Sequence, residues 1–408
     1  MFRLNRYRVL EIGTAVSMPL CASVLANLGA EVIKVESRKK LDGNRVRVPR
    51  KDAPANIDQI ETFTLFHDLN GGKKSVSLNL KTAAGRAIFL DLIRVSDVFI
   101  QNFAPGWLDR LDLSVATLAE ANPRLIQMYA SGYGQHGPLS GVRVYATIMS
   151  GIGGLEGVVG YPDGDVTGLS ATAFGDPNSG QFGVLAVLSA LHARERTGRG
   201  CLIDLSQIES IATVLGEAVI DLQASGQVPG PTGNRSRWVA PHGIYRCAGS
   251  DRWVALAVPR DEEWQALRAL LVAEGQSWAA EARFASAATR LEHARELDDL
   301  ISAWTLPQTD QTLALRLQAR GIRCTPVLPI EEVETDPHMV ARHFMQQATH
   351  PILGAMPITS TPWRHDGAQP PIRGAGPMFG SANEEIYRGL LGMSAARYQE
   401  CQDSEVFA

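Results

Sequence analysis

The stretch RVLEIGTAVSMPLCASVLANLGAEVIKVE, residues 8–36, decides the fold. Residues 8–14 predict a buried strand, and residues 19–28 repeat apolar side chains at helical spacing until Gly29 stops the helix. Residues 30–36 predict a second strand, so the stretch favours a right-handed βαβ unit in a parallel sheet. The turn after the first strand lacks the G-x-G-x-x-G fingerprint of a dinucleotide site. A nicotinamide-dependent oxidoreductase is therefore not indicated.

The same alternation of helix and strand continues along the chain. Helical spacing covers residues 82–94, and strands are predicted at 97–103 and 124–130. A further helix at 182–194 precedes GRGCLIDLSQIES, residues 198–210, which predicts a strand and the start of another helix. We therefore expect an α/β fold with a large, Rossmann-like parallel-sheet domain.

A second, smaller domain is predicted, because 408 residues are long for one compact domain. Residues 225–237, SGQVPGPTGNRSR, have no hydrophobic period and predict a linker. After it, residues 243–247 and 252–258 predict antiparallel strands, and 261–320 are mostly helical. Beyond Pro326 we expect a return to the first domain and a final helix at 383–398. The prediction is a large domain of residues 1–220 and 327–408 with an α+β domain, 221–326, inserted.

Composition narrows the classes of function. A net charge of −4, with basic and acidic residues mixed, does not favour a nucleic-acid partner. The five cysteines form no Cys-x-x-Cys pair, so we expect reduced thiols and no metal site. The N-terminus lacks the apolar core of a signal peptide, and no run reaches about 18 apolar residues. We expect a cytoplasmic protein that does not associate with membranes.

Asp176, in the string AFGDPNSGQF at residues 173–182, allows two interpretations. An Asp before Pro177 is a common helix start, in which the carboxylate caps free amide groups. The same position keeps the carboxylate ionised, and an ionised Asp in a partly dry pocket is a competent nucleophile towards an activated acyl group. Gly175 and Gly180 would let a ligand approach the backbone.

The chain resembles the class III CoA-transferases, the family of formyl-CoA transferase and carnitine CoA-transferase. The resemblance is carried by GDPNSG at 175–180 with ARERTGRG at 193–200, and it extends over nearly the whole chain in order. The other matching segments are residues 9–36, LNGGKKSVSLNL (69–80), QNFAPGWLDRL (101–111), NPRLIQMYASGYGQHGP (122–138) and GIRCTPVL (321–328).

The resemblance implies the chemistry and the site. Asp176 would attack an acyl-CoA thioester to give a mixed anhydride, and CoA would then convert it to an aspartyl-CoA thioester. Coenzyme A is a substrate in this family, so no permanently bound cofactor is expected. The resemblance also implies an interlocked dimer. The residues it assigns to substrate or CoA binding are Ala15, Val16, Ser17, Arg38, Lys73, Lys74, Asn102, Phe103, Arg110, Arg143 and Tyr145.

At two positions the sequence departs from the family pattern, and the residue roles that the resemblance implies do not transfer directly there. Some members have a glutamine at the position of Val16, and valine cannot donate a side-chain hydrogen bond. An oxyanion there would depend on backbone N–H groups or on the Ser17 hydroxyl. The family's arginine after the second strand is also displaced by one position, with Ser37 in its place and Arg38 beside it.

Three alternatives stay open at this point. An α-methylacyl-CoA racemase shares the fold but needs two acid/base groups, and the His-Asp pair of those relatives is Val142-Arg143 here. His136 and His67 match no histidine of those relatives. A non-catalytic partner in a complex of two homologous chains is disfavoured by the intact GDPNSG string. Within the transferases, GVVGYPDGDVTG at 157–168 resembles variants that act on dicarboxylic or aromatic acids, with succinyl-CoA as donor.

Overall fold

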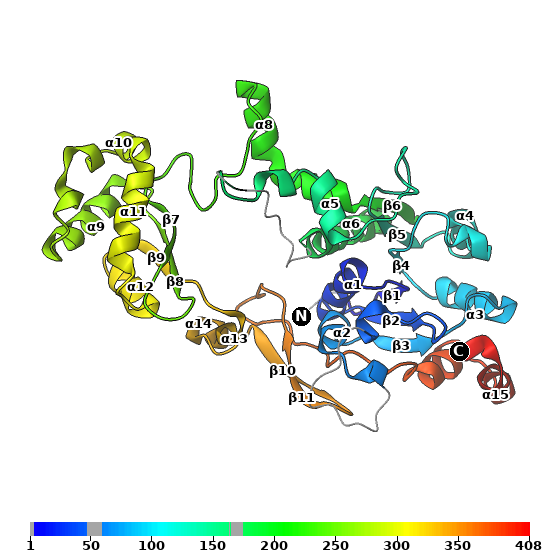
Figure 1. Ribbon diagram of the computed structural model, residues 1–408. Helices are drawn as coiled ribbons and strands as arrows, with labels where there is room; N and C mark the ends of the chain where they lie inside the picture. Colours follow the sequence, from blue (N-terminus) through cyan, green and yellow to red (C-terminus); the bar gives the residue numbers. More distant parts are fainter. Residues whose placement is uncertain (1–3, 47–58, 163, 165–173) are drawn as a thin grey trace. The chain divides into compact units, whose positions relative to one another are not determined.

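The computed structural model describes residues 4–46, 59–162, 164 and 174–408 (Figure 1). The chain divides into two compact units. The larger consists of residues 1–155, 169–223 and 337–408, and the smaller of residues 156–168 and 224–336. We propose that these units are the two domains expected from the sequence.

The larger unit is built on a six-stranded sheet in the order β3-β2-β1-β4-β5-β6. Each neighbouring pair of strands runs parallel, which confirms the predicted α/β fold. The strands are β1 Arg8–Glu11, β2 Glu31–Glu36, β3 Lys74–Ser77, β4 Val98–Gln101, β5 Ile126–Ser131 and β6 Cys201–Ser206. In this doubly wound order the chain changes direction between β1 and β4, and ligands bind beyond the carboxyl ends of the strands at such a switch point.

Helices cover both faces of the sheet because apolar side chains along each strand point alternately to either face. The ribbon shows helices on both faces of the sheet (Figure 1). Val9 packs in one core with side chains of α1 and α6, whereas its neighbour Leu10 packs in another with side chains of α3 and α4. The helices of this unit before residue 226 are α1 Ser17–Asn27, α2 Thr64–Leu69, α3 Ala83–Arg94, α4 Val115–Ala121, α5 Ala146–Ile152, α6 Gly175–Thr197, α7 Gln207–Ala212 and α8 Gly216–Ser225.

The C-terminal segment returns to the same sheet. After α14 Pro337–Ala341 and the hairpin of β10 Met345–His350 and β11 Gly354–Thr359, it runs along β3. There the Tyr387 hydroxyl donates to Ser77 O at 3.0 Å, and the Tyr387 ring stacks on Phe407 at 4.6 Å.

The helix predicted at 383–398 is wrong as one element. A π-helical segment, Glu384–Leu390, is followed by a separate helix, α15 Ala395–Asp403. Gly392 has a φ of +68°, which an L side chain adopts only with strain, and the Ser394 side chain caps α15 by accepting from Arg397 N.

The smaller unit combines an antiparallel sheet with a helical layer. Its strands are β7 His242–Arg246, β8 Trp253–Ala257 and β9 Arg323–Pro326, in that order in the sheet. The predicted pair of strands and the helical region between residues 261 and 320 are confirmed. The helices are α9 Asp261–Ala273, α10 Ala287–Glu292, α11 Ala294–Thr305, α12 Asp310–Gln318 and α13 Ile330–Val333.

Candidate functional site

A pocket of about 250 Å³ lies in the larger unit beyond the carboxyl ends of its central strands. Residues that follow four parallel strands line it: Ile12–Thr14 after β1, Ser37 and Lys39–Asp42 after β2, Leu78–Lys81 after β3, and Phe103 with Trp107 after β4. This is the edge of the sheet at which a doubly wound fold binds its ligand.

The wall of this pocket combines aromatic rings with lysines. The rings of Phe103 and Trp107 stack with their centroids 4.3 Å apart and their planes at 24°. The Lys40 ammonium lies 5.0 Å from the centre of the Phe103 ring, and Lys39 and Lys81 also line the pocket. Flat apolar rings next to cations suit a ligand that has both an aromatic base and phosphates.

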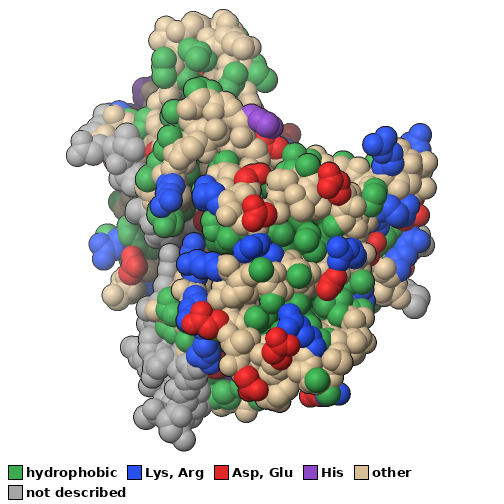
Figure 2. All heavy atoms as spheres, turned by 90° about the vertical axis from the view of Figure 1, so that its right-hand side faces the viewer, with side chains coloured by type: hydrophobic (Ala, Val, Ile, Leu, Met, Phe, Trp, Pro, Cys, Tyr) green, Lys and Arg blue, Asp and Glu red, His purple; other side chains and the backbone are tan. Residues whose placement is uncertain are grey.

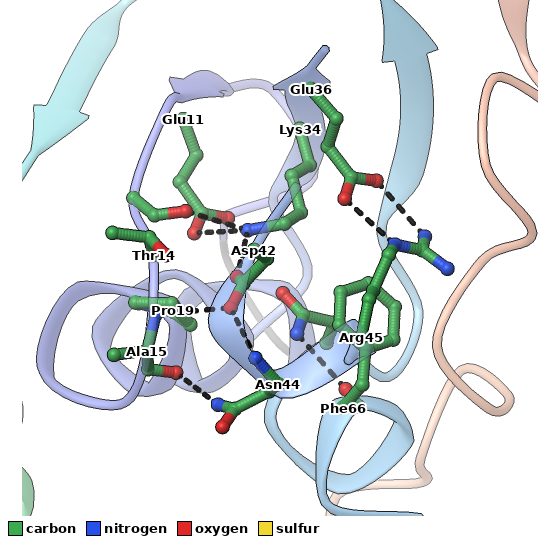
Figure 3. Close-up of polar contacts among 12 residues, drawn as sticks. Glu11, Thr14, Ala15, Pro19, Lys34, Glu36, Asp42, Asn44, Arg45 and Phe66 are labelled. Carbon is green, nitrogen blue, oxygen red and sulfur yellow. Dashed lines mark hydrogen bonds and ion pairs between the residues drawn. The ribbon is translucent and has the colours of Figure 1, made fainter. Parts of the chain in front are cut away.

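The turn between β1 and α1 is held rigidly beside this pocket (Figure 3). Ala15 has a φ of +62°, a conformation that costs an L-residue about 1 kcal/mol. Its N–H donates to Asp42 Oδ1 at 3.1 Å, and its carbonyl accepts from Asn44 Nδ2 at 2.6 Å. Asn102 clamps Thr14 from the other side, accepting from its N–H at 2.9 Å and donating to its carbonyl at 2.8 Å. The turn thereby sets where α1 begins.

Buried charges support the turn from below, and sequence reasoning missed them. Lys34 Nζ lies 3.3 Å from Glu11 Oε1 and 3.2 Å from Asp42 Oδ2, and it donates to Gly13 O at 2.7 Å (Figure 3). Lys73 Nζ reaches the other oxygen of Glu11 at 2.7 Å. Such a group is stable only while every charge keeps its partner, because an unpaired buried ion is very costly.

The two lysines respond differently to the same carboxylate. Burial disfavours the charge of Lys34, but Glu11, Asp42 and Glu36 outweigh it, and the pKa of Lys34 is raised. Burial dominates at Lys73, where Glu11 compensates only partly and the charge of Lys34 opposes, so its pKa is lowered to about 8. Lys34 is therefore the firmly charged partner of Asp42.

Asp176 lies in the first turn of α6 and is half-buried. The N-cap residue is Phe174, whose side chain makes no capping hydrogen bond, so the interpretation of Asp176 as the N-cap residue is wrong. The start of a helix still favours an ionised carboxylate in the first turn. Gln207 Nε2 donates to Asp176 Oδ1 at 3.3 Å.

Close packing of α6 on α1 fixes Asp176 relative to the β1–α1 turn. A Cβ added at Gly180 would lie only 2.8 Å from the Ser17 carbonyl oxygen, so the two helices meet backbone to backbone there. Asp176 precedes Gly180 by four residues, and positions i and i+4 lie on the same face of a helix. Asp176 is therefore carried on the face of α6 that meets the start of α1.

Sequence reasoning also missed Gln207, the first residue of α7. Its side chain is buried, with 6% of the residue exposed. The only signal for it was its place directly after the β6 strand, at the same edge of the sheet as the other site residues.

Asn102 contacts Thr14 and Ser17 at the start of α1, next to Ala15 and Val16 in the chain, and Phe103 lines the pocket. The Ser17 residue is 1% exposed, and its hydroxyl accepts from Asn102 Nδ2 at 3.2 Å. The hydroxyl therefore contacts Asn102, and its role towards an acyl group stays a proposal.

Lys73 and Lys74 are placed differently from the expectation. Lys73 Nζ is buried and donates to Glu11, Pro19 O and Asn70, which corrects the expectation that it contacts CoA directly. Lys74 Nζ pairs with Glu31 at 2.7 Å and Glu385 at 2.6 Å, and these carboxylates neutralise its charge.

The remaining predicted residues are exposed. The Arg38 guanidinium lies 5.1 Å from the centre of the Phe379 ring. Arg110 follows the Phe103–Trp107 pair, whereas Arg143 and Tyr145 immediately precede α5 and do not line the pocket. Part of the 157–168 stretch that suggested the acid class, namely 163 and 165–168, lies outside the described residues.

Comparison with known proteins identifies the family. The sequence model of CoA-transferase family III matches residues 4–383. The chain is 32% identical over 392 residues to succinyl-CoA–D-citramalate CoA-transferase of Chloroflexus aurantiacus, covering 96% of this chain and 94% of the relative. It is 31% identical to acetyl-CoA:oxalate CoA-transferase of Acetobacter aceti, covering 86% and 87% of the two chains. The chain therefore belongs to CoA-transferase family III and is a CoA-transferase.

Solved structures agree with this assignment. A CAIB/BAIF family protein of Brucella suis superposes with a TM-score of 0.86 at 28% identity, covering 95% of this chain and 99% of that one. A Mycobacterium tuberculosis protein shares the fold with a TM-score of 0.77 at 22% identity, covering 94% and 98%.

Three further features concern the described part of the chain. No helix there has the length and apolar character needed to cross a membrane. No group of three or more His, Cys, Asp or Glu side chains among those residues is arranged to hold a metal ion. On the face shown in Figure 2, Lys and Arg side chains are interspersed with Asp and Glu.

Proposed function

We propose that the protein transfers CoA from an acyl-CoA thioester to a free carboxylic acid, with Asp176 as the nucleophile. The observation that carries this proposal is the place of Asp176, half-buried in the first turn of α6 on the face that packs against the start of α1. The start of a helix favours an ionised carboxylate, and α6 carries this one beside the β1–α1 turn that borders the pocket.

The reaction proceeds in four displacements at carbonyl carbons. An oxygen of Asp176 attacks the thioester carbonyl, the C–S bond breaks, and CoA leaves as a thiolate from a mixed anhydride. The thiolate then attacks Cγ of Asp176, the bond from Cγ to the bridging oxygen breaks, and the donor acid leaves as a carboxylate.

The second half of the cycle reverses these roles. The acceptor carboxylate attacks Cγ of the aspartyl-CoA thioester and expels the thiolate. The thiolate finally attacks the acceptor carbonyl, which releases the new acyl-CoA and restores the Asp176 carboxylate. Anhydride and thioester are both energetic acyl donors, so the intermediates of the cycle differ little in free energy as long as water is excluded.

The pocket beyond β1 to β4 is the proposed site for the nucleotide end of CoA. Phe103 and Trp107 offer a stacked surface for adenine, and Lys39, Lys40 and Lys81 offer charges for its phosphates. Ala15 to Ser17 then lead from this pocket towards Asp176. Arg38, Arg110, Arg143 and Tyr145 remain proposed contacts to the rest of the substrate.

The substrates are proposed to be a succinyl-CoA donor and a dicarboxylic acceptor. Relatives at 32% and 29% identity are named succinyl-CoA–D-citramalate and succinyl-CoA–L-malate CoA-transferases, and two others act on oxalate by name. Succinyl-CoA should be tested against citramalate, malate, oxalate and an aromatic acid, with product mass as readout. Acyl-CoA substrates and free thiols such as Cys21 suit the cytoplasm, where we place the reaction.

We also propose that the chain acts as a dimer. Apolar side chains project into solvent from three helices, α5, α6 and α8, as expected of a surface that another chain covers. They are Ile148 and Ile152 on α5, Leu185 on α6, and Val219, Ile220 and Leu222 on α8. Relatives include the alpha and beta subunits of a malate CoA-transferase, so a homologous chain is the second candidate partner. Light scattering of the purified chain distinguishes a homodimer from a monomer that awaits an unlike partner.

Trapping of the intermediate tests the proposed nucleophile. The protein is incubated with succinyl-CoA and hydroxylamine, and peptides are examined by mass spectrometry. A hydroxamate on Asp176 is expected, and it is absent in Asp176→Asn, which should lose transfer while it keeps CoA binding. Glu262→Gln, an exposed acid in the first turn of α9, is the matched control and should keep full activity. Turnover of Asp176→Asn near the unaltered rate would exclude this nucleophile.

A further inference from the structure

Gln207 is placed to act on the nucleophile itself. Its Nε2 donates to Asp176 Oδ1 at 3.3 Å, and the residue is only 6% exposed. The carboxylate fixes which end of the amide faces it, because two oxygen atoms would repel each other. Gln207 has no counterpart among the residues that the sequence assigned to the site.

The amide is held by contacts that tie α7 to α6. The hydroxyls of Ser179 and Ser210 are 2.7 Å apart, and Asn178 Nδ2 donates to Ser210 O at 2.7 Å. The Ser210 hydroxyl also lies within hydrogen-bond distance of Gln207 O, at 2.7 Å. The first turn of each helix is thereby fixed to the other, so the amide is in place before reaction begins.

The Gln207 amide donor bears on two of the four displacements in the proposed reaction. If Asp176 is the nucleophile proposed above, two of the four displacements occur at its own Cγ. In each of them the negative charge of the tetrahedral intermediate develops on the oxygen of Asp176 that is not displaced. A donor already aimed at that oxygen stabilises the transition state without reorganisation.

We propose that Gln207 is a catalytic residue that stabilises the oxyanion formed on Asp176. It acts when the CoA thiolate attacks the anhydride at Cγ and when the acceptor carboxylate attacks the aspartyl-CoA thioester. In the two displacements at substrate carbonyls the oxyanion forms on the substrate, so Gln207 stabilises their transition states less. Val16 has no side-chain donor, so those displacements depend on backbone amides or on the Ser17 hydroxyl.

The test compares Gln207→Met, which keeps the length of the side chain but removes the donor, with the unaltered protein. Each is mixed with succinyl-CoA without acceptor and quenched in acid within milliseconds. Intact-protein mass spectrometry then measures the ratio of acyl adduct to CoA adduct on the enzyme. Gln311→Met, the same substitution at an exposed position in the first turn of α12, is the control.

The proposal predicts that Gln207→Met lowers kcat by about 100-fold, the effect of losing one oxyanion donor. It also predicts that the acyl adduct accumulates over the CoA adduct by at least about tenfold, because the attack at Cγ is slowed. Gln311→Met should leave the ratio of adducts unchanged. Gln207→Glu should be inactive at neutral pH and recover as the pH falls, because a protonated carboxyl group donates where a carboxylate repels.

A wild-type ratio of adducts in Gln207→Met, with kcat within threefold, would overturn the role of Gln207 and leave Asp176 as nucleophile. A uniform loss of both adducts that thermal melting traces to unfolding, together with no recovery of Gln207→Glu at low pH, would show a structural role instead. Absence of any adduct in the unaltered protein would overturn the proposed function itself.

Discussion

Replacement of Gly180 by alanine displaces the proposed nucleophile by a calculable distance. The added Cβ would lie 2.8 Å from the Ser17 carbonyl oxygen, whereas an ordinary contact needs at least 3.4 Å. The helices α6 and α1 must therefore move apart by about 0.6 Å, because the opposing atom belongs to the backbone and cannot rotate away. A misplacement of 1 Å costs roughly 100-fold in rate, so we expect kcat to fall roughly 10- to 20-fold.

The stability of this variant should change little. Alanine gains about 1 kcal/mol over glycine inside a helix, and overpacking costs about 1–3 kcal/mol. The net loss is at most about 2 kcal/mol, which lowers the melting temperature by a few degrees. The dissociation constant for CoA should stay within about twofold, because the nucleotide pocket does not involve α6.

Steady-state kinetics, CoA titration and thermal melting of Gly180→Ala check this prediction. Gly183→Ala is the matched control on the same helix. Its Cβ would meet Cys21 Sγ at 3.1 Å and Met18 Cε at 3.2 Å, which belong to side chains that can shift. It should keep kcat within threefold. If Gly180→Ala turns over at the unaltered rate, the packing of α6 on α1 does not set the geometry of the reaction.

Three further predictions concern the pocket, its buried charges and the buried His350 of β10. Phe103→Ala should raise KM for the acyl-CoA about tenfold with kcat within twofold in steady-state kinetics, because the stacked surface binds substrate and transition state alike; a fall in kcat alone would contradict this. Asp42→Ala should lower the free energy of unfolding in urea by about 3–5 kcal/mol, because Lys34 stays buried without one of its carboxylate partners. The control Lys39→Met breaks an exposed ion pair with Glu405 and should lower it by at most about 1 kcal/mol. Burial, together with the charges of His67 and Arg45, lowers the pKa of His350 to about 4 in the folded protein. In the unfolded chain this pKa is near 6.5, so below that pH the unfolded chain binds more protons than the folded one. The free energy of unfolding therefore decreases as the pH is lowered below about 6.5. The unfolding free energy lost between pH 7.5 and pH 5 should shrink by about 1–2 kcal/mol in His350→Asn, and an equal loss in both proteins would refute the role of this histidine.

Local pattern was enough to predict most of the sheet. Residues 8–36 form a parallel βαβ unit because alternating apolar residues need two covered faces and because Gly29 ends the helix between the strands. The final helix was mispredicted because the apolar spacing continues through Gly392, whose positive φ interrupts it. Local spacing cannot reveal which residue will take that conformation.

The site was harder to predict from the sequence, because its support depends on contacts between residues that are distant in the chain. Lys73 pairs with Glu11 across 62 positions, and nothing in the Lys-Lys pair of residues 73 and 74 distinguishes the buried lysine from its neighbour at the surface. Gln207 likewise reaches Asp176 across 31 positions. Only the fold brings these side chains together, so residue type and spacing could not assign them.

Transfer of oxygen from the acceptor to Asp176 tests the central claim most directly. A donor and acceptor pair that turns over is supplied with both acceptor carboxylate oxygens as oxygen-18, in ordinary water. If the acceptor attacks Cγ of an aspartyl-CoA thioester, the bridging oxygen stays on the enzyme, and the peptide that contains Asp176 gains one heavy oxygen. An unlabelled peptide after many turnovers would mean that the carboxylate of Asp176 is never acylated.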